Sequence, residues 1–144
     1  MRKQRGFTLI ELLVVIAIIG LLSTLAVVAL NSARLKARDA KRIADVKQIQ
    51  TGLELYFNDK TQYPVQTGTL GSTNFACLGT GGFGVVGTAC GSPYMGLVPS
   101  NPTPMGADYV YTGASASYSI TFKLEGQTGG LAGTVHTATQ DGIN

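Results

Sequence analysis

The chain has 144 residues, of which 13% are charged, and a formal net charge of +3. This length accommodates one ordinary domain. The positive excess comes from Arg2, Lys3 and Arg5, and the remaining side chains carry eight basic and eight acidic groups. The basic balance therefore does not indicate a nucleic-acid partner, and we predict none.

An apolar segment follows this basic leader and runs from Phe7 to Leu30. It has 24 residues and one charged side chain, that of Glu11. As an α-helix it would be about 36 Å long, enough to cross a bilayer with some tilt. It is too long for the apolar core of a secretory signal, and no small-residue cleavage site follows it. The pattern predicts a transmembrane helix in which Glu11 is functional, because ionisable residues are rare in such segments.

The run Gly6-Phe7-Thr8-Leu9-Ile10-Glu11 ahead of this segment resembles the class III leader of type IV pilins and type II secretion pseudopilins. The resemblance covers roughly the first thirty residues. It implies that a prepilin peptidase cleaves between Gly6 and Phe7, and that the new Phe7 amine is methylated. It also implies that inner-membrane machinery assembles copies of the chain into a helical filament, with Glu11 as an assembly residue.

The predicted location follows from the same resemblance. Before assembly the chain would be a single-pass protein of the cytoplasmic membrane, with its C-terminal part outside the cytoplasm, and it would end in a cell-surface filament. Five basic residues follow the apolar segment within twelve positions, so the positive-inside rule alone favours the opposite orientation. Many pilins have a proline near the position of Val28, and this chain has only Gly20 as a soft point in the helix.

Residues Asn31 to Asn58 continue the predicted helix and form its amphipathic half. The apolar positions of its buried face are Ile43, Val46, Ile49, Leu53, Tyr56 and Phe57. The opposite face is predicted to carry Arg38, Lys41, Arg42, Asp45, Lys47 and Glu54. These charges indicate a solvated face, with contact to anionic lipid headgroups or to DNA as alternatives. The helix is expected to end near residues 58–61, with Asn58 as a left-handed C-cap.

Residues Val65 to Pro104 are rich in glycine and proline, which predicts an exposed, irregular loop. The run Gly79 to Gly84 superficially resembles a phosphate-binding loop but has no Lys-Ser/Thr partner and opens no helix. Cys77 and Cys90 lie in this loop and are the only cysteines. In an extracytoplasmic domain they are expected to form a disulfide, with free thiols or a metal site as alternatives.

Strand patterns appear only after this loop. Residues Asp108 to Thr112 are aromatic and β-branched, and Tyr118 to Glu125 alternate strictly, which places Tyr118, Ile120, Phe122 and Leu124 on one face. A weaker pattern covers Leu131 to Thr139. The fold class expected is α+β: one long helix from about Phe7 to Asn58, with a small antiparallel sheet packed on its second half.

The predicted division of the chain is a leader (1–6), a transmembrane and assembly half of the helix (7–30), an amphipathic half (31–60) and a globular head (61–144). The sequence has no recognisable catalytic spacing, so no enzymatic activity is predicted. His136, the single histidine, is expected to be structural. No cofactor is expected, and the late acids Asp108, Glu125 and Asp141 are too dispersed to predict calcium.

The leading functional hypothesis is a structural subunit of a type IV pilus-like filament. Its expected partners are other copies of the chain, the prepilin peptidase, the inner-membrane assembly machinery and membrane lipid. The alternative within this class is a major pseudopilin of a type II secretion system. An alternative of another class is a membrane-tethered binding module, which would not require Glu11 or the Gly6-Phe7 pair.

Overall fold

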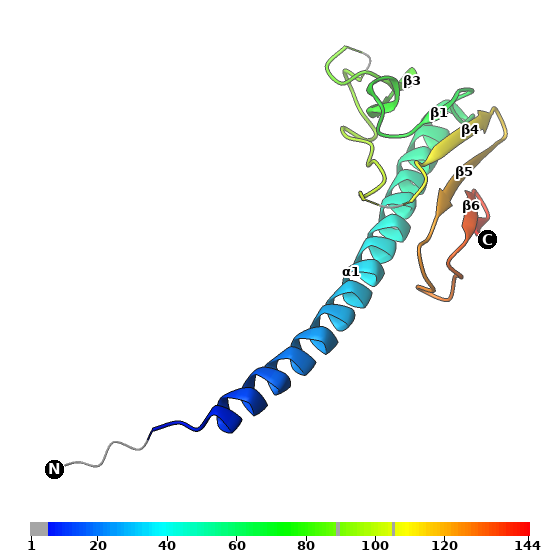
Figure 1. Cartoon of the computed structure of the whole chain (residues 1–144). Coiled ribbons are helices and arrows are strands. Elements are labelled where there is room, and N and C mark those ends of the chain that lie inside the picture. Colours follow the sequence, from blue (N-terminus) through cyan, green and yellow to red (C-terminus); the bar gives the residue numbers. More distant parts are fainter. Residues whose placement is uncertain (1–5, 89, 105) are drawn as a thin grey trace. The chain divides into compact units, whose positions relative to one another are not determined.

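The structure is a computed structural model that describes residues 6–88, 90–104 and 106–144. One long helix, α1 (Leu9–Lys60), is followed by small antiparallel sheets (Figure 1). This arrangement confirms the α+β class. The chain divides into two compact units, the first up to Leu35 and the second from Lys36 to Asn144. The predicted boundaries at residues 6, 30 and 60 stay a prediction.

α1 begins two residues later than expected and ends at Lys60, within the predicted range of 58–61. At the start, Thr8 precedes the first helical residue and bonds to the first turn, as described below. At the end, the left-handed residue is Thr61 (φ 56°), whose N–H donates to the carbonyl oxygen of Phe57 over 2.7 Å. The prediction of Asn58 as the C-cap was wrong, because Asn58 is itself helical. The helix continues through Gly20 without a break.

The main sheet has five antiparallel strands in the order β1-β4-β5-β6-β7. Their bounds are β1 (Thr67–Thr69), β4 (Val110–Ala114), β5 (Ser117–Lys123), β6 (Val135–Thr139) and β7 (Gly142–Ile143). The expected hairpin forms between β4 and β5, with Ala114 opposite Ser117 across a two-residue connection. The late residues thus form a meander that continues through β6 to β7.

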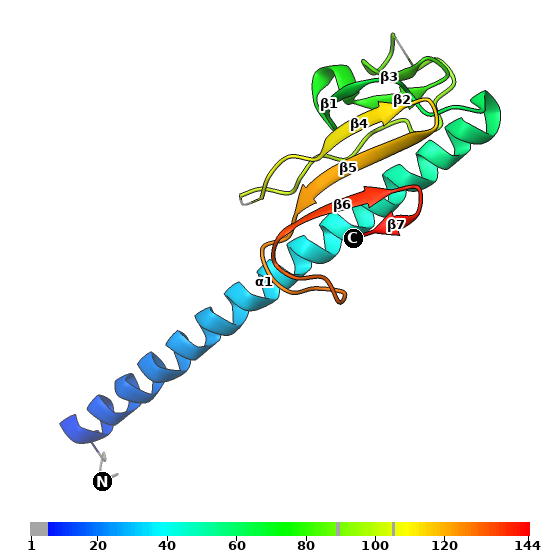
Figure 2. The ribbon, with the colours of Figure 1, turned by 90° about the vertical axis from the view of Figure 1, so that its right-hand side faces the viewer.

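The sheet lies along the second half of α1 (Figure 2) and encloses the core of the second unit. Tyr118, Ile120, Phe122 and Leu124 are at most 4% exposed, which confirms the predicted inner face of β5. The facing helical residues Val46, Ile49 and Leu53 are fully buried, as predicted. Full burial of one such aliphatic side chain stabilises the fold by about 1.5–3 kcal/mol.

The glycine-rich segment differs from the predicted exposed loop. It contains the short 3₁₀ helix η1 (Thr73–Phe75) and a second sheet of β2 (Cys77–Gly79) and β3 (Gly82–Gly84), whose six residues are all buried. Close packing explains part of the glycine content. A Cβ on Gly68 would lie 2.2 Å from the Phe75 ring, and Gly82, the first residue of β3, has φ +101°. The prediction of an irregular surface loop was therefore wrong for this part.

Candidate assembly site and buried ion network

The predicted cleavage residues precede the helix. Gly6 and Phe7 lie outside α1, and the Phe7 side chain is 84% exposed. The rest of the predicted leader, residues 1–5, lies outside the described residues. An exposed, non-helical dipeptide is accessible to a protease. The roles of Gly6 and Phe7 in cleavage and methylation stay predictions.

Glu11 bonds to the residue that caps its own helix. The Thr8 N–H donates to Glu11 Oε2 over 2.8 Å, and the Thr8 hydroxyl donates to the same oxygen over 2.7 Å. In return the Glu11 N–H donates to the Thr8 hydroxyl oxygen over 3.3 Å. This reciprocal pattern is a capping box, in which the residue before the helix and the third helical residue satisfy each other's free groups. The carboxylate therefore has local partners within a single chain.

The apolar half of α1 exposes its side chains on every side. From Phe7 to Leu30 each large hydrophobic residue is at least 45% exposed. The most apolar 18-residue window of α1 has a mean hydropathy of 2.9, and none of it is buried. By length and composition, α1 is the one helix among the described residues that can cross a membrane. Thr24, a polar residue of this half, donates its hydroxyl to the Leu21 carbonyl oxygen over 2.8 Å.

A second group of charges lies inside the second unit, around Arg42. The Arg42 guanidinium is fully buried, and its Nη1 lies 2.7 Å from Asp39 Oδ1 and 2.7 Å from Glu125 Oε1. Its Nε donates to Asn101 Oδ1 over 2.8 Å, and its Nη2 donates to the Pro102 carbonyl oxygen over 3.2 Å. One guanidinium thus joins α1 to Glu125, shortly after β5, and to the adjacent residues Asn101 and Pro102.

Asp39 and Arg38 complete this ion network. Asp39 is fully buried and accepts the backbone N–H groups of Glu125 (3.0 Å) and Gly126 (2.8 Å). Arg38 forms a two-pronged pair with Glu125, with distances of 2.9 Å from Nε and 2.5 Å from Nη2. The hydrogen bonds from Arg38, helped by Arg42 and opposed by burial, lower the pKa of Glu125 to about 2. The carboxylate therefore stays ionised over the whole physiological range.

This network corrects the predicted solvated face of the helix. Arg42 and Asp45 were expected on that face, yet they are 0% and 8% exposed. Asp45 instead accepts a hydrogen bond from the Tyr109 hydroxyl over 3.2 Å, and burial raises the pKa of this carboxyl. Lys41 and Lys47 are exposed as predicted. With Arg38 and Arg42 occupied by carboxylates, a lipid or DNA contact through these two residues is disfavoured.

Cys77 and Cys90 are bonded to each other, so the structure has the predicted disulfide and no free cysteine among its described residues. His136 is 8% exposed, with Nδ1 3.0 Å from the Asn144 oxygen and Nε2 2.8 Å from the Ala132 oxygen. Its ring packs on Phe122. Within the described ranges, no group of three or more His, Cys, Asp or Glu residues could hold a metal ion.

Residues 1–27 match the prokaryotic N-terminal methylation motif. This match confirms the resemblance to type IV pilins and pseudopilins that the run from Gly6 to Glu11 indicates. It covers the residues around the predicted cleavage bond and most of the apolar half of α1.

The relatives are more specific. The chain is 39% identical to type II secretion system core protein G of Dickeya chrysanthemi over 71 residues, which are 49% of this chain and 46% of that protein. The protein of the same name from Escherichia coli is 44% identical over 62 residues, 43% of each chain, and that from Klebsiella pneumoniae is 41% identical over 64 residues, 44% of this chain and 46% of the relative. The chain thus spans less than half the length of the curated relatives it matches. No solved structure matches it significantly.

Proposed function

We propose that this chain is a structural subunit of a pilus-like filament, stored in the cytoplasmic membrane as a prepilin and polymerised through the apolar half of α1. The observation that carries the proposal is the combination of the methylation motif with an apolar helix that exposes all its large side chains. Such a surface must meet lipid or other copies of itself, because no part of the same unit covers it. Nothing in this role requires enzymatic chemistry, and the relatives are named as components of a secretion system.

Within this class, the relatives favour a type II secretion pseudopilin over a pilus subunit, which reverses the order of the two hypotheses drawn from sequence. All three relatives above have the name type II secretion system core protein G. By analogy, the filament would be a short secretion pseudopilus and would act on the export of other proteins. The choice between pseudopilin and pilus subunit can be tested in cells. Deletion of this chain should abolish secretion of extracellular enzymes and leave pilus-dependent adhesion unchanged.

Processing comes before assembly in this proposal. The peptidase would cleave between Gly6 and Phe7, and the Phe7 amine would then be methylated. In the mature chain Glu11 would pair with the Phe7 amine of a neighbouring subunit. In a packed helical core water is excluded, so an unpaired carboxylate is costly and the pair would fix the axial register. The exchange would require Glu11 to give up its bonds to Thr8.

The decisive experiment replaces Glu11 by alanine and follows membrane fractionation together with fibre yield. Glu11→Ala should leave insertion intact or improved, because a charge is removed from the apolar segment, while fibre yield falls sharply. Glu11→Gln keeps the shape without the charge and should be intermediate or equally defective. Thr8→Ala is the matched control, since it removes the hydroxyl that bonds to Glu11 and keeps the carboxylate. Normal fibres from Glu11→Ala would contradict the pairing between subunits.

The competing function is a membrane-tethered binding module. It makes the opposite prediction, because a tether needs neither the Gly6-Phe7 bond nor Glu11. A purified chain that retains Met1 and is never recovered in filaments of any length would favour the tether. A mature N-terminus at Phe7, measured by intact mass, would favour the filament.

A further inference from the structure

One part of the second unit has no charge. Residues 61–107 contain no Asp, Glu, Lys or Arg, and the charged residues of the unit belong to α1 or follow residue 107. The same segment exposes four large apolar side chains: Val65, Val85, Val86 and Leu97. The buried centres of protein interfaces are depleted in charge and enriched in apolar contact. This uncharged segment is therefore the part of the head best suited to a protein partner.

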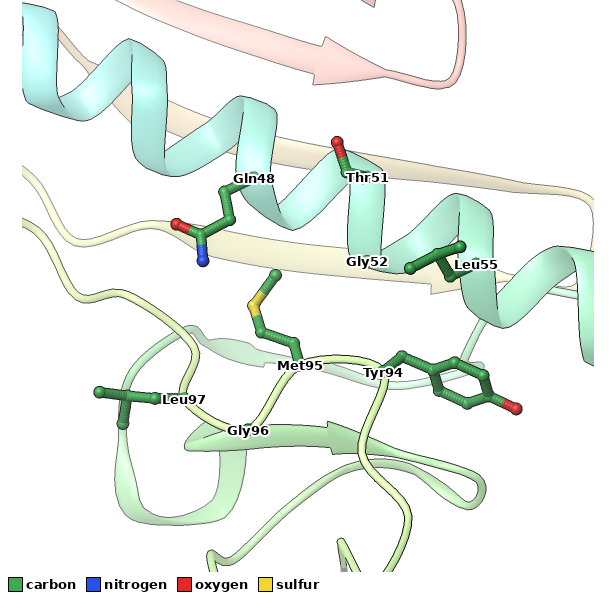
Figure 3. Close-up of a pocket in the computed structure, with 8 residues that line it drawn as sticks. All are labelled: Gln48, Thr51, Gly52, Leu55, Tyr94, Met95, Gly96 and Leu97. Atoms are coloured by element: carbon green, nitrogen blue, oxygen red, sulfur yellow. The ribbon is translucent and has the colours of Figure 1, made fainter.

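A groove of about 460 Å³ lies between this segment and α1 (Figure 3). Its floor is Met95, whose side chain points to the helix at Gly52. A Cβ on Gly52 would lie 2.9 Å from the Met95 methyl carbon, so the glycine in mid-helix permits this close approach. The rims are Leu55 and Leu97, which are 50% and 72% exposed. The groove is thus lined by uncharged residues and has apolar side chains on both borders.

The second unit also has an exposed turn, residues 85–88, that begins with two apolar side chains. Val85 and Val86, at its start, are 37% and 54% exposed, and the Thr88 N–H donates to the Val85 carbonyl oxygen over 3.4 Å. Strand β3 precedes the turn, and the disulfide of Cys90 to the buried Cys77 follows it. Anchoring at both ends restrains the turn before any contact, which lowers the entropy lost on binding.

Met95 of the groove and strand β3 flank β2 on opposite sides. Leu78 of β2 pairs with Met95, the groove floor, on one side and with Phe83 of β3 on the other. The turn follows β3 directly. Two strand spacings, about 10 Å, therefore separate Met95 from β3 across this layer. Two different surfaces of one molecule that bind each other form a heterologous contact, which builds an open helical array when its rotation does not close a ring.

We propose that the 85–88 turn of one copy docks in the Gly52–Met95 groove of the next copy. This inference rests on the proposed filament function and adds a contact between heads to the packing of the apolar helices. A second copy is favoured over another partner because both surfaces are uncharged, so neither leaves a charge unpaired on burial. Val135, another exposed valine, is less suited, since it lies opposite the charged Lys123 on the sheet.

Site-specific photo-crosslinking in sheared fibres tests the contact. A photoreactive amino acid in place of Val86 should link neighbouring subunits, and mass spectrometry should map the link to residues 48–55 or 94–97. The same group in place of Val135, which is 59% exposed, is the matched control and should not reach these peptides. Fibres in which position 86 gives no link, or a link elsewhere, would overturn the head contact and leave the filament itself intact. Absence of any fibre from the unmodified chain would instead contradict the proposed function.

A charge swap provides the second test. Val86→Asp and Leu55→Lys should each lower fibre yield by about tenfold, because each buries an unpaired charge in an uncharged contact. The double variant should recover most of the yield, since the two charges then meet. Val135→Asp is the control and should assemble normally. Both positions are exposed, so the thermal unfolding of the head should not change. A normal fibre yield from the single variants would reject the contact. So would a double variant whose fibre yield is no higher than that of either single variant.

Discussion

The two units of this chain differ in where they place charged and apolar side chains. The first, up to Leu35, exposes large hydrophobic side chains throughout and satisfies its single carboxylate with the adjacent Thr8. The second buries its apolar side chains and also buries charges, with Arg42 and Asp39 fully covered. The second unit encloses an apolar core of its own, whereas the first has an apolar surface that none of its own described residues covers.

The largest effect is expected from breaking the network inside the second unit. Arg42→Ala leaves the carboxylates of Asp39 and Glu125 in the interior without their shared cation, which costs about 3–5 kcal/mol. Differential scanning calorimetry of the full chain in detergent should show a large fall in Tm, with membrane insertion unchanged. Lys41→Ala, one position earlier and exposed, is the control and should change stability by less than about 0.5 kcal/mol. Equal effects of the two variants would contradict the assignment.

Reduction of the disulfide should have the next largest effect. A closed loop of this size stabilises the fold by about 3 kcal/mol in the entropy model. We expect Cys77 and Cys90 to resist thiol labelling without reductant, and reductant to increase amide exchange in β2 and β3 before it affects α1. Full labelling of both thiols in native, exported protein would exclude the bridge.

Acid should weaken the second unit by a smaller amount. The pKa of Glu125 is lowered to about 2, below its ordinary value of 4.5, so its pairing stabilises the fold fully above pH 4.5. This contribution is lost as the pH falls from about 4.5 towards 2, because the unfolded chain takes up the proton first. Tm measured across this range should fall more steeply for the native chain than for Glu125→Gln. Parallel curves would show that other carboxylates govern acid unfolding.

The smallest effect concerns the first unit. Thr8→Ala removes the hydroxyl of the capping box, which costs about 1 kcal/mol of local helix stability. Hydrogen exchange should increase in the first turn of α1, while Tm of the second unit stays constant. Thr8→Ser keeps the hydroxyl and should behave like the native chain. Loss of protection throughout α1 would show that the two units are not independent in this respect.

The sequence was sufficient to predict the structure of a segment where a single periodicity or motif determines it. The apolar run and its lone Glu11 indicated the exposed helix, and the alternation from Tyr118 to Leu124 gave the inner face of β5. The glycine-rich segment was read as an exposed loop because composition signals turns. Burial of β2 depends on contacts of Leu78 with Met95 and with α1 near Gly52, and burial of β3 on the contact of Phe83 with Tyr111, all of them distant in the sequence.

The ion network shows most clearly what tertiary structure alone decided. Asp39 and Arg42 extend the spacing of Val46, Ile49 and Leu53 by one further repeat, so the sequence did contain a signal for their burial. Arg42 was nevertheless predicted to lie on the solvated face, since an isolated ion is costly to bury. Burial becomes favourable only with Glu125, Asn101 and two backbone N–H groups in place, and the fold alone brings these together across more than 50 residues of chain. Local sequence patterns therefore determined the helix and the strands, and long-range pairing determined which charges the second unit could enclose.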